Sequence, residues 1–163
     1  MPSWLILYAT TPVDGLSAAA LERELRRADW WTLTEAEGFD AAVAGTLDPR
    51  FVETGPDGAF DGVVQYAQGR RPIVLHHWAS PEDVAEVRVE ALEREPPGEA
   101  RRYVEGAVEV VGLEMGWSAY DNGGIVVAWE IARLLVRHCN GTAAVQDDDD
   151  RWYVLDGWVW RQL

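Results

Sequence analysis

The stretch from Ile125 to Leu155, IVVAWEIARLLVRHCNGTAAVQDDDDRWYVL, contains a helix pattern, a helix stop and a hairpin pattern in succession. From Ile125 to Cys139 apolar residues recur at i, i+3, i+4 and i+7, the spacing of one helix face. Asn140-Gly141 is a typical C-terminal stop for such a helix. Thr142–Gln146 and Trp152–Leu155 flank four aspartates and predict two strands of a hairpin. A helix followed by consecutive strands indicates an α+β fold.

Upstream of this stretch the sequence predicts one strand and two helices. Trp4–Ala9 is a short apolar run, typical of a buried strand. Ser17 is a candidate N-cap for an amphipathic helix over Ala18–Ala28. Ser80-Pro81-Glu82-Asp83 offers a capping serine, a proline at the first helical position and two acids in the first turn. The helix that it starts should end at Pro96-Pro97-Gly98.

The remaining segments favour strands and one long loop over 47–62, which is rich in glycine, proline and aspartate. We expect further strands at Trp30–Thr34, Asp40–Thr46, Val63–Ala67, Ile73–Trp78, Tyr103–Trp117 and, after a turn at Asp156-Gly157, Trp158–Trp160. The 163 residues are about the length of one domain. The sequence therefore predicts a single α+β domain over residues 1–163, with a mainly antiparallel sheet and about three helices packed on one face.

The chain is strongly acidic. Its 28 acidic and 14 basic residues, the latter all arginine, give a formal net charge of −14. Such a surface repels phosphate backbones and anionic membranes, so we expect neither nucleic acid nor a membrane as a direct partner. It attracts basic proteins and accelerates their encounter, although solubility alone is another reason for the charge. The single cysteine indicates a reducing compartment, and we expect a cytoplasmic protein.

Acidic and aromatic residues gather near the C-terminus. There are nine tryptophans in the chain. Trp4, Trp117 and Trp129 lie in apolar patterns and are candidate core residues, whereas three others follow the aspartate run at even spacing. On one strand face, aromatic anchors beside carboxylates would form a protein-binding surface. The candidate partner-binding residues are Asp147, Asp148, Asp149, Asp150, Trp152, Trp158 and Trp160. A solvated hairpin tip and a helix-covered aromatic face are the alternatives.

Metal and catalytic patterns are not found in the sequence. His76 and His77 are adjacent in a predicted strand, so their side chains should point to opposite faces and not share one ion. His138 and Cys139 are adjacent on a predicted helix and should diverge by about 100°. Asp147–Asp150 does not follow the calcium-loop pattern, and no nucleophile motif or phosphate-binding loop occurs. We therefore expect no metal, no cofactor, no catalytic residue and no enzymatic activity.

The C-terminal third resembles a known class of small proteins. The helix Ile125–Cys139, its stop at Asn140-Gly141 and the returning strand from Asp150-Arg151-Trp152 are similar to the helix–hairpin unit of small cytoplasmic immunity proteins from bacterial toxin–immunity (polymorphic toxin) systems. The opening strand–turn–helix fits the same arrangement. Such proteins bind a toxin and block or sequester it. The resemblance implies a binding function and assigns no individual residue.

The sequence thus leads to one principal hypothesis and two alternatives. The principal hypothesis is an immunity or inhibitor protein that neutralises a basic bacterial toxin by direct binding. The first alternative is a small-molecule-binding or enzymatic α+β domain with a pocket between sheet and helices. The second is an acidic DNA mimic, which requires carboxylates spaced like phosphates.

Overall fold

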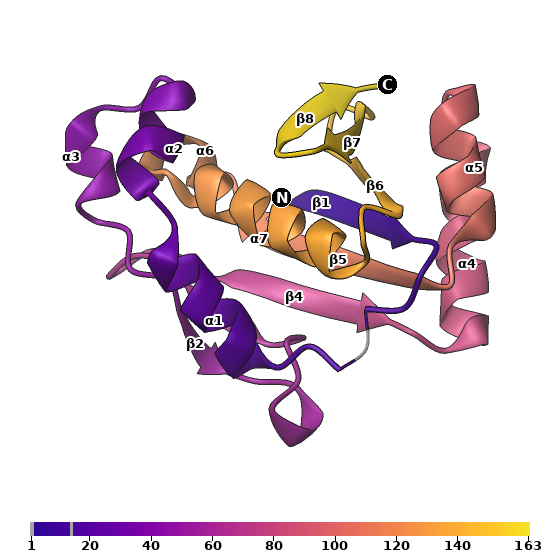
Figure 1. Cartoon of the computed structure of the whole chain (residues 1–163), viewed down its shortest axis with the longest axis horizontal. Helices are drawn as coiled ribbons and strands as arrows, with labels where there is room; N and C mark the ends of the chain where they lie inside the picture. Colours follow the sequence, from indigo (N-terminus) through magenta and orange to yellow (C-terminus); the bar gives the residue numbers. More distant parts are fainter. Residues whose placement is uncertain (1, 14) are drawn as a thin grey trace. The chain divides into compact units, whose positions relative to one another are not determined.

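Eight strands form one hydrogen-bonded sheet in the computed structural model, which describes residues 2–13 and 15–163 (Figure 1). Their order is β2-β3-β4-β5-β1-β6-β7-β8. The strands are β1 (Pro2–Ala9), β2 (Arg50–Glu53), β3 (Val63–Gln65), β4 (Ile73–Trp78), β5 (Glu109–Gly116), β6 (Ala143–Gln146), β7 (Trp152–Asp156) and β8 (Val159–Gln162). The pairs β2–β3, β3–β4, β1–β6, β6–β7 and β7–β8 are antiparallel. The α+β class with a mainly antiparallel sheet is confirmed.

Over the same described residues there are seven α-helices and one short 3-10 helix, where about three helices were expected. They are α1 (Ala18–Arg27), α2 (Trp30–Ala36), α3 (Ala41–Ala44), η1 (Pro56–Gly58), α4 (Pro81–Glu93), α5 (Gly98–Gly106), α6 (Ala119–Asn122) and α7 (Gly124–His138). The expected number was too low because α2, α3 and α6 are only seven, four and four residues long. Helical periodicity shows only in longer segments.

The strands predicted at Trp30–Thr34 and Asp40–Thr46 are wrong, because α2 and α3 occupy these segments. In each case a carboxylate caps the helix start. Asp29 Oδ1 accepts a hydrogen bond from the backbone N–H of Thr32 at 3.2 Å. Asp40 Oδ1 accepts one from the N–H of Ala42 at 2.8 Å. These caps satisfy N–H groups that lack a helical partner, which favours helix over the strand tendency of aromatic and β-branched residues.

The predicted serine caps are confirmed, whereas two other segments need correction. Ser17 Oγ accepts from the N–H of Ala20 at 3.0 Å at the start of α1, and Ser80 Oγ accepts from the N–H of Asp83 at 3.2 Å at the start of α4. The strand expected from Tyr103 begins only at β5, because α5 extends to Gly106. The expected loop over 47–62 contains β2 and η1.

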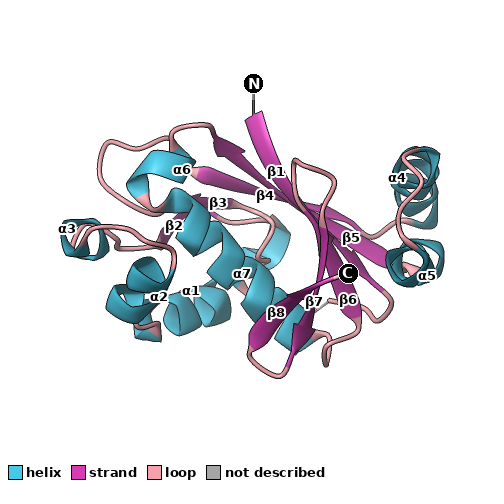
Figure 2. Cartoon of the chain, turned by 90° about the horizontal axis from the view of Figure 1, so that it is seen from above, coloured by secondary structure: helices cyan, strands magenta, loops and turns pink. Residues whose placement is uncertain are grey.

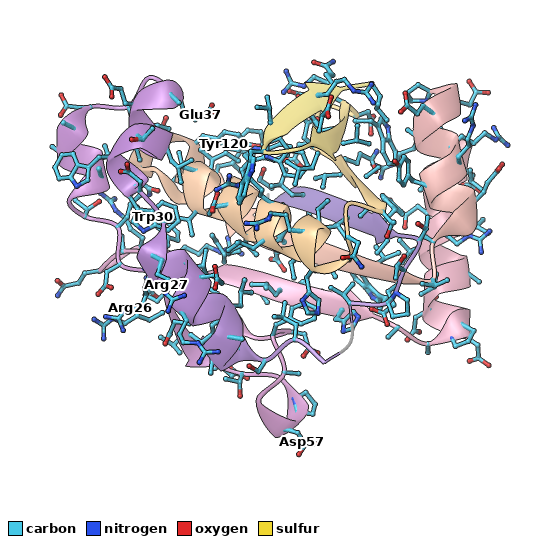
Figure 3. All side chains as sticks on the ribbon, in the orientation of Figure 1. Arg26, Arg27, Trp30, Glu37, Asp57 and Tyr120 are labelled. Atoms are coloured by element: carbon cyan, nitrogen blue, oxygen red, sulfur yellow. The ribbon has the colours of Figure 1, made fainter. Side chains whose placement is uncertain are left out.

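The described residues divide into two compact units. Unit 1 comprises those within Met1–Ser3, Gly15–Leu75 and Leu113–Ile131, and unit 2 comprises those within Trp4–Asp14, His76–Gly112 and Ala132–Leu163. In unit 1, the N–H of Phe51 on β2 donates to Glu22 Oε1 on α1 at 2.7 Å. Trp30 at the start of α2 is buried, while Arg26 and Arg27 end α1 on its exposed side (Figure 3).

Within unit 2, helices lie on both faces of the strands, where one covered face was expected (Figure 2). Helices α4 and α5 cover the face that Tyr8 and Trp152 share. Leu7 and Val145 are directly paired, alternate with Tyr8 and Ala144 along β1 and β6, and are fully buried on the other face. The core beneath α4 and α5 consists of Tyr8, Val84, Ala91, Ala100, Val104, Ala107, Val110, Ala144, Trp152 and Val154.

Candidate functional site

The aspartate run lies in the loop between β6 and β7, and its first residue organises that loop. The Asp147 side chain is only 8% exposed. Its Oδ1 accepts hydrogen bonds from the N–H groups of Asp149 and Arg151, each at 3.0 Å. Its Oδ2 accepts from Arg151 Nε at 2.9 Å and from the Tyr153 hydroxyl at 3.3 Å. Arg151 also binds Asp149 Oδ2 at 2.7 Å. The carboxylate of Asp147 is therefore a structural acceptor.

The other aspartates connect the loop to its surroundings in unit 2. Asp148 Oδ1 accepts from the backbone N–H of Trp4 on β1 at 2.8 Å. Asp150 Oδ1 accepts from Gln146 Nε2 at 2.8 Å and lies 3.5 Å from Arg94 Nη1 at the end of α4. The run thus differs from a uniformly solvated tip, because each carboxylate makes a defined contact within the protein.

The three C-terminal tryptophans do not share one face, and this expectation is wrong. Trp152 is 2% exposed and packs on Tyr8 with ring centroids 5.3 Å apart, so it belongs to the core. In the β7–β8 hairpin, Leu155 pairs with Trp160. Directly paired residues share a face, so Trp160 lies on the face opposite to Trp152. With a two-residue turn between β7 and β8, paired residues are an odd number of positions apart. Residues an even number apart on the two strands, such as Trp152 and Trp160, therefore lie on opposite faces.

Trp158 is the exposed member of the three. It lies in the β7–β8 turn and is 60% exposed. The guanidinium of Arg137 lies 3.8 Å from the centroid of its ring, and that of Arg133 lies 5.4 Å away. Trp160 is half-buried. Of the three predicted tryptophans, Trp158 therefore has the largest exposed fraction, and the guanidinium of Arg137 packs against its ring.

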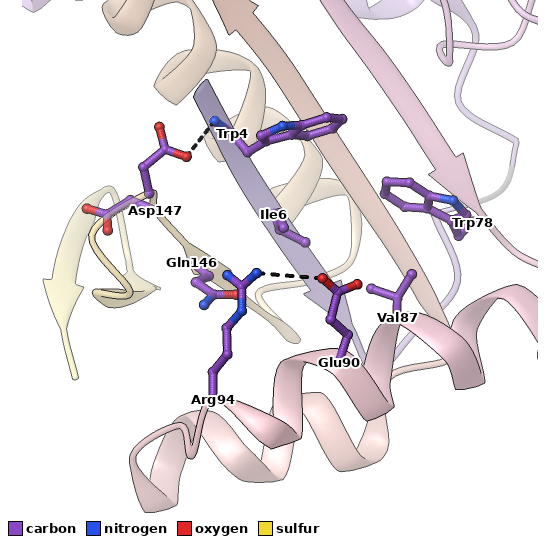
Figure 4. Close-up of a pocket in the computed structure, with 9 residues that line it drawn as sticks. Trp4, Ile6, Trp78, Val87, Glu90, Arg94, Gln146 and Asp147 are labelled. Atoms are coloured by element: carbon purple, nitrogen blue, oxygen red, sulfur yellow. Dashed lines mark hydrogen bonds and ion pairs between the residues drawn. The ribbon is translucent and has the colours of Figure 1, made fainter. Parts of the chain in front are cut away.

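A pocket in unit 2 brings together residues that the sequence gave no reason to combine (Figure 4). Two of its lining side chains, Trp4 on β1 and Trp78 on β4, form an aromatic cluster with His76 on β4, which does not itself line the pocket. This cluster of three rings is here called the aromatic shelf. The rings of Trp4 and His76 are 5.1 Å apart, and those of His76 and Trp78 are 5.8 Å apart and nearly parallel, at 13°. All three side chains are half-buried, so part of each ring remains accessible.

Gly112 on β5 makes the aromatic shelf possible. Strand β5 lies between β4 and β1 in the sheet order. A β-carbon at Gly112 would lie 2.9 Å from the ring of Trp78 and 3.0 Å from that of Trp4. Contacts this close require the rings to move. The missing side chain lets aromatic groups from two non-adjacent strands approach each other across β5.

Charged residues line the rest of the pocket, which has a volume of about 380 Å³. Glu90 on α4 and Arg94 at its C-cap face Gln146 at the end of β6 and Asp147 in the loop after it (Figure 4). Asp148 also lines the pocket. Ile6 and Val87 complete the lining. Three carboxylates and one guanidinium therefore surround two indoles.

A chain of polar contacts passes through residues that line this pocket, Gln146, Arg94 and Glu90. The Tyr8 hydroxyl donates to Gln146 Oε1 at 3.3 Å, and Gln146 in turn donates to Asp150. Burial raises the pKa of the Tyr8 hydroxyl, with the charge of Arg94 acting in the opposite direction. Tyr8 therefore remains a neutral donor at physiological pH. Arg94 Nη2 lies 3.6 Å from Glu90 Oε1, which completes the chain.

His76, His77 and Cys139 each make contacts within the protein. His76 belongs to the aromatic shelf, whereas His77 Nε2 lies 2.8 Å from Glu109 Oε2. Burial, followed by the charge of Glu109, raises the pKa of the Cys139 thiol to about 11. Its Sγ donates to the carbonyl of Leu135 at 3.2 Å. Among residues 2–13 and 15–163, no group of three or more His, Cys, Asp or Glu side chains is arranged to hold a metal ion.

Sequence reasoning located one edge of the pocket and missed the rest. Asp147 and Asp148 were predicted as binding residues, whereas Trp4 was predicted to lie in the core and Trp78 was only the last residue of a predicted strand. The available signal was the pair His76 and Trp78, two residues apart on one predicted strand face. Nothing in the sequence placed that strand near Trp4.

Comparison of the chain with known protein families, curated proteins and solved structures finds no significant match. In the part of the chain that the structure describes, no helix has both the length and the apolar character needed to cross a bilayer.

Proposed function

We propose that this protein is an inhibitor of the immunity class, which neutralises a basic toxin by binding it directly. One observation supports this proposal more than any other: a pocket with two accessible indoles is bordered by carboxylates in a chain of net charge −14. Such a pocket suits a cationic side chain, because the faces of indole rings and carboxylates both attract positive charge. The net charge adds long-range attraction for a basic partner.

The binding surface proposed here differs from the one expected from the sequence. It is centred on Trp4, Trp78 and Glu90, with Asp148 at the edge of the aspartate loop. Trp152 has no part in it, since its side chain is buried. Trp158 remains a candidate contact in the same unit because its ring is exposed.

The test is affinity capture from source-strain lysate at low salt with nuclease added, using wild-type protein and two variants as bait. Trp78→Leu removes one indole of the pocket, and Glu82→Gln is the control, because it removes a charge two turns earlier on α4. We expect one basic protein to bind wild type and Glu82→Gln, to bind Trp78→Leu less, and to be released by high salt. The captured protein should stop the growth of a sensitive host when it is expressed alone, and co-expression of the wild-type inhibitor should restore that growth.

A second candidate function is small-molecule binding, which the pocket volume of about 380 Å³ favours. This volume lies in the range of about 300–1,000 Å³ that ligand pockets occupy. If only the bait is recovered, and a metabolite raises the melting temperature of wild type but not of Trp78→Leu, the inhibitor proposal is wrong.

A further inference from the structure

The pocket contains a guanidinium of the chain itself, and this group indicates what the pocket binds. Arg94 lies between two carboxylates, 3.6 Å from Glu90 Oε1 and 3.5 Å from Asp150 Oδ1. Charge-assisted hydrogen bonds are typically about 2.7–2.9 Å long, so both contacts are loose. The side chains of Arg94 and Glu90 are 52% and 70% exposed. Exposed ion pairs of this kind contribute little to stability, so Arg94 is readily displaced.

The aromatic shelf selects for a flat cation. The indoles of Trp4 and Trp78 line the pocket beside the carboxylates, and the His76 ring packs against both of them. Guanidinium is planar, stacks on indole and is weakly hydrated, whereas ammonium is compact and strongly hydrated. Trp is also the ring that attracts cations most strongly.

The space beside Arg94 matches an incoming side chain. The pocket volume is about 380 Å³, and a smaller recess of about 50 Å³ lies next to it. Both are lined by Ile6, Val87, Glu90, Arg94 and Gln146, and the recess extends to Tyr8. The apolar side chains of Ile6 and Val87, which suit an alkyl stem, and the carboxylate of Glu90, which suits a cationic end, thus share one lining.

We propose that the pocket binds an arginine side chain of the basic partner, which stacks on the aromatic shelf and replaces Arg94 at Glu90. The identity of the partner rests on the proposed function, but binding of an arginine side chain by the pocket can be tested without the partner. Arg94 then acts as an internal competitor that occupies the acceptor until the partner arrives.

The experiment is an NMR titration of the full chain with Nα-acetyl-arginine methylamide, monitored at the indole N–H signals of Trp4 and Trp78. Trp4→Phe and Trp78→Phe assign the two signals. The citrulline analogue is the matched neutral control, and the lysine analogue tests shape. We expect saturable shifts with a dissociation constant on the order of 1–10 mM for arginine, several-fold weaker binding for lysine and no saturable shifts for citrulline.

Three variants test whether Arg94 opposes arginine binding and Glu90 favours it. Arg94→Gln should strengthen arginine binding by roughly 3- to 10-fold, because it removes the competitor. Glu90→Gln should weaken binding by a similar factor, and Glu82→Gln should leave it unchanged. A misfolded variant cannot produce the gain expected of Arg94→Gln, so this result separates a binding effect from a folding effect.

The proposal is overturned if citrulline shifts the two indole signals as arginine does, if arginine gives no saturable shift, or if Arg94→Gln weakens binding. These outcomes are distinguishable from failure of the proposed function. Arginine binding without any captured basic protein contradicts the proposed function alone. Capture of a basic toxin by a pocket that does not bind arginine contradicts this inference alone.

Discussion

Replacing Trp152 by alanine should destabilise the protein strongly, whereas replacing Trp158 should not. Trp152 is 2% exposed and packs on Tyr8 at 5.3 Å, so its removal leaves a cavity in the core of unit 2. Large-to-small changes of a buried aromatic residue cost about 3–5 kcal/mol. Trp158 is 60% exposed, and its loss removes mainly the arginine contact at 3.8 Å, worth about 0.5–1 kcal/mol.

Urea unfolding followed by far-UV circular dichroism measures both effects without depending on tryptophan fluorescence. With a slope of about 2 kcal/mol per molar urea, Trp152→Ala should lower the midpoint by about 1.5–2.5 M, and Trp158→Ala by at most about 0.5 M. Trp152→Phe should recover part of the loss, because a ring still packs on Tyr8. Equal midpoints for the two alanine variants would show that Trp152 is not the core residue described here.

Three further predictions concern the loop, a helix cap and the thiol. Asp147→Ala should lower the free energy of unfolding by about 2–3 kcal/mol, because four hydrogen bonds lose their acceptor. Asp149→Ala should lower it by less than about 0.5 kcal/mol, because the Asp149 side chain is exposed. Urea titration of both variants measures the difference. Ser80→Ala should cost about 1 kcal/mol by the same assay, through loss of the cap of α4. Cys139 should resist a disulfide-exchange reagent at pH 8 in the native protein and react fully in denaturant, because its pKa is raised to about 11 and its side chain is buried. Rapid native labelling would contradict that burial.

The fold could be predicted from the sequence where a local signal extends over enough residues. Helices α4 and α7 were recognised by a capping serine and by 15 residues of apolar periodicity, respectively. Helix α2 was missed because its seven residues include tryptophan and threonine, which favour strands when taken alone. Its decisive feature is the side chain of Asp29, which caps the helix from outside the segment.

The candidate site was less predictable, because it depends on which strands become neighbours. Trp4 and Trp78 are 74 positions apart, and they meet only because Gly112 lies on the strand between theirs. An isolated glycine in a strand pattern suggests a bulge or a close approach of other groups. At Gly112 the structure shows the close approach. No spacing rule within one segment encodes such a contact.

The acidic residues contribute in two physically different ways, and kinetics with the captured partner should separate them. Asp149 is 72% exposed and pairs at 2.7 Å with Arg151, which is itself 51% exposed, so its charge acts mainly at long range. Asp149→Asn should therefore slow association and flatten its salt dependence while leaving dissociation unchanged. Glu90 is expected to touch the partner's cation, so Glu90→Gln should accelerate dissociation by roughly 3- to 10-fold. If Glu90→Gln alters only the association rate, Glu90 contributes to steering and is no contact of the bound state. On this reasoning the exposed charge of the aspartate run accelerates association, whereas Glu90, which lines the pocket with the two indoles, sets the residence time of the complex.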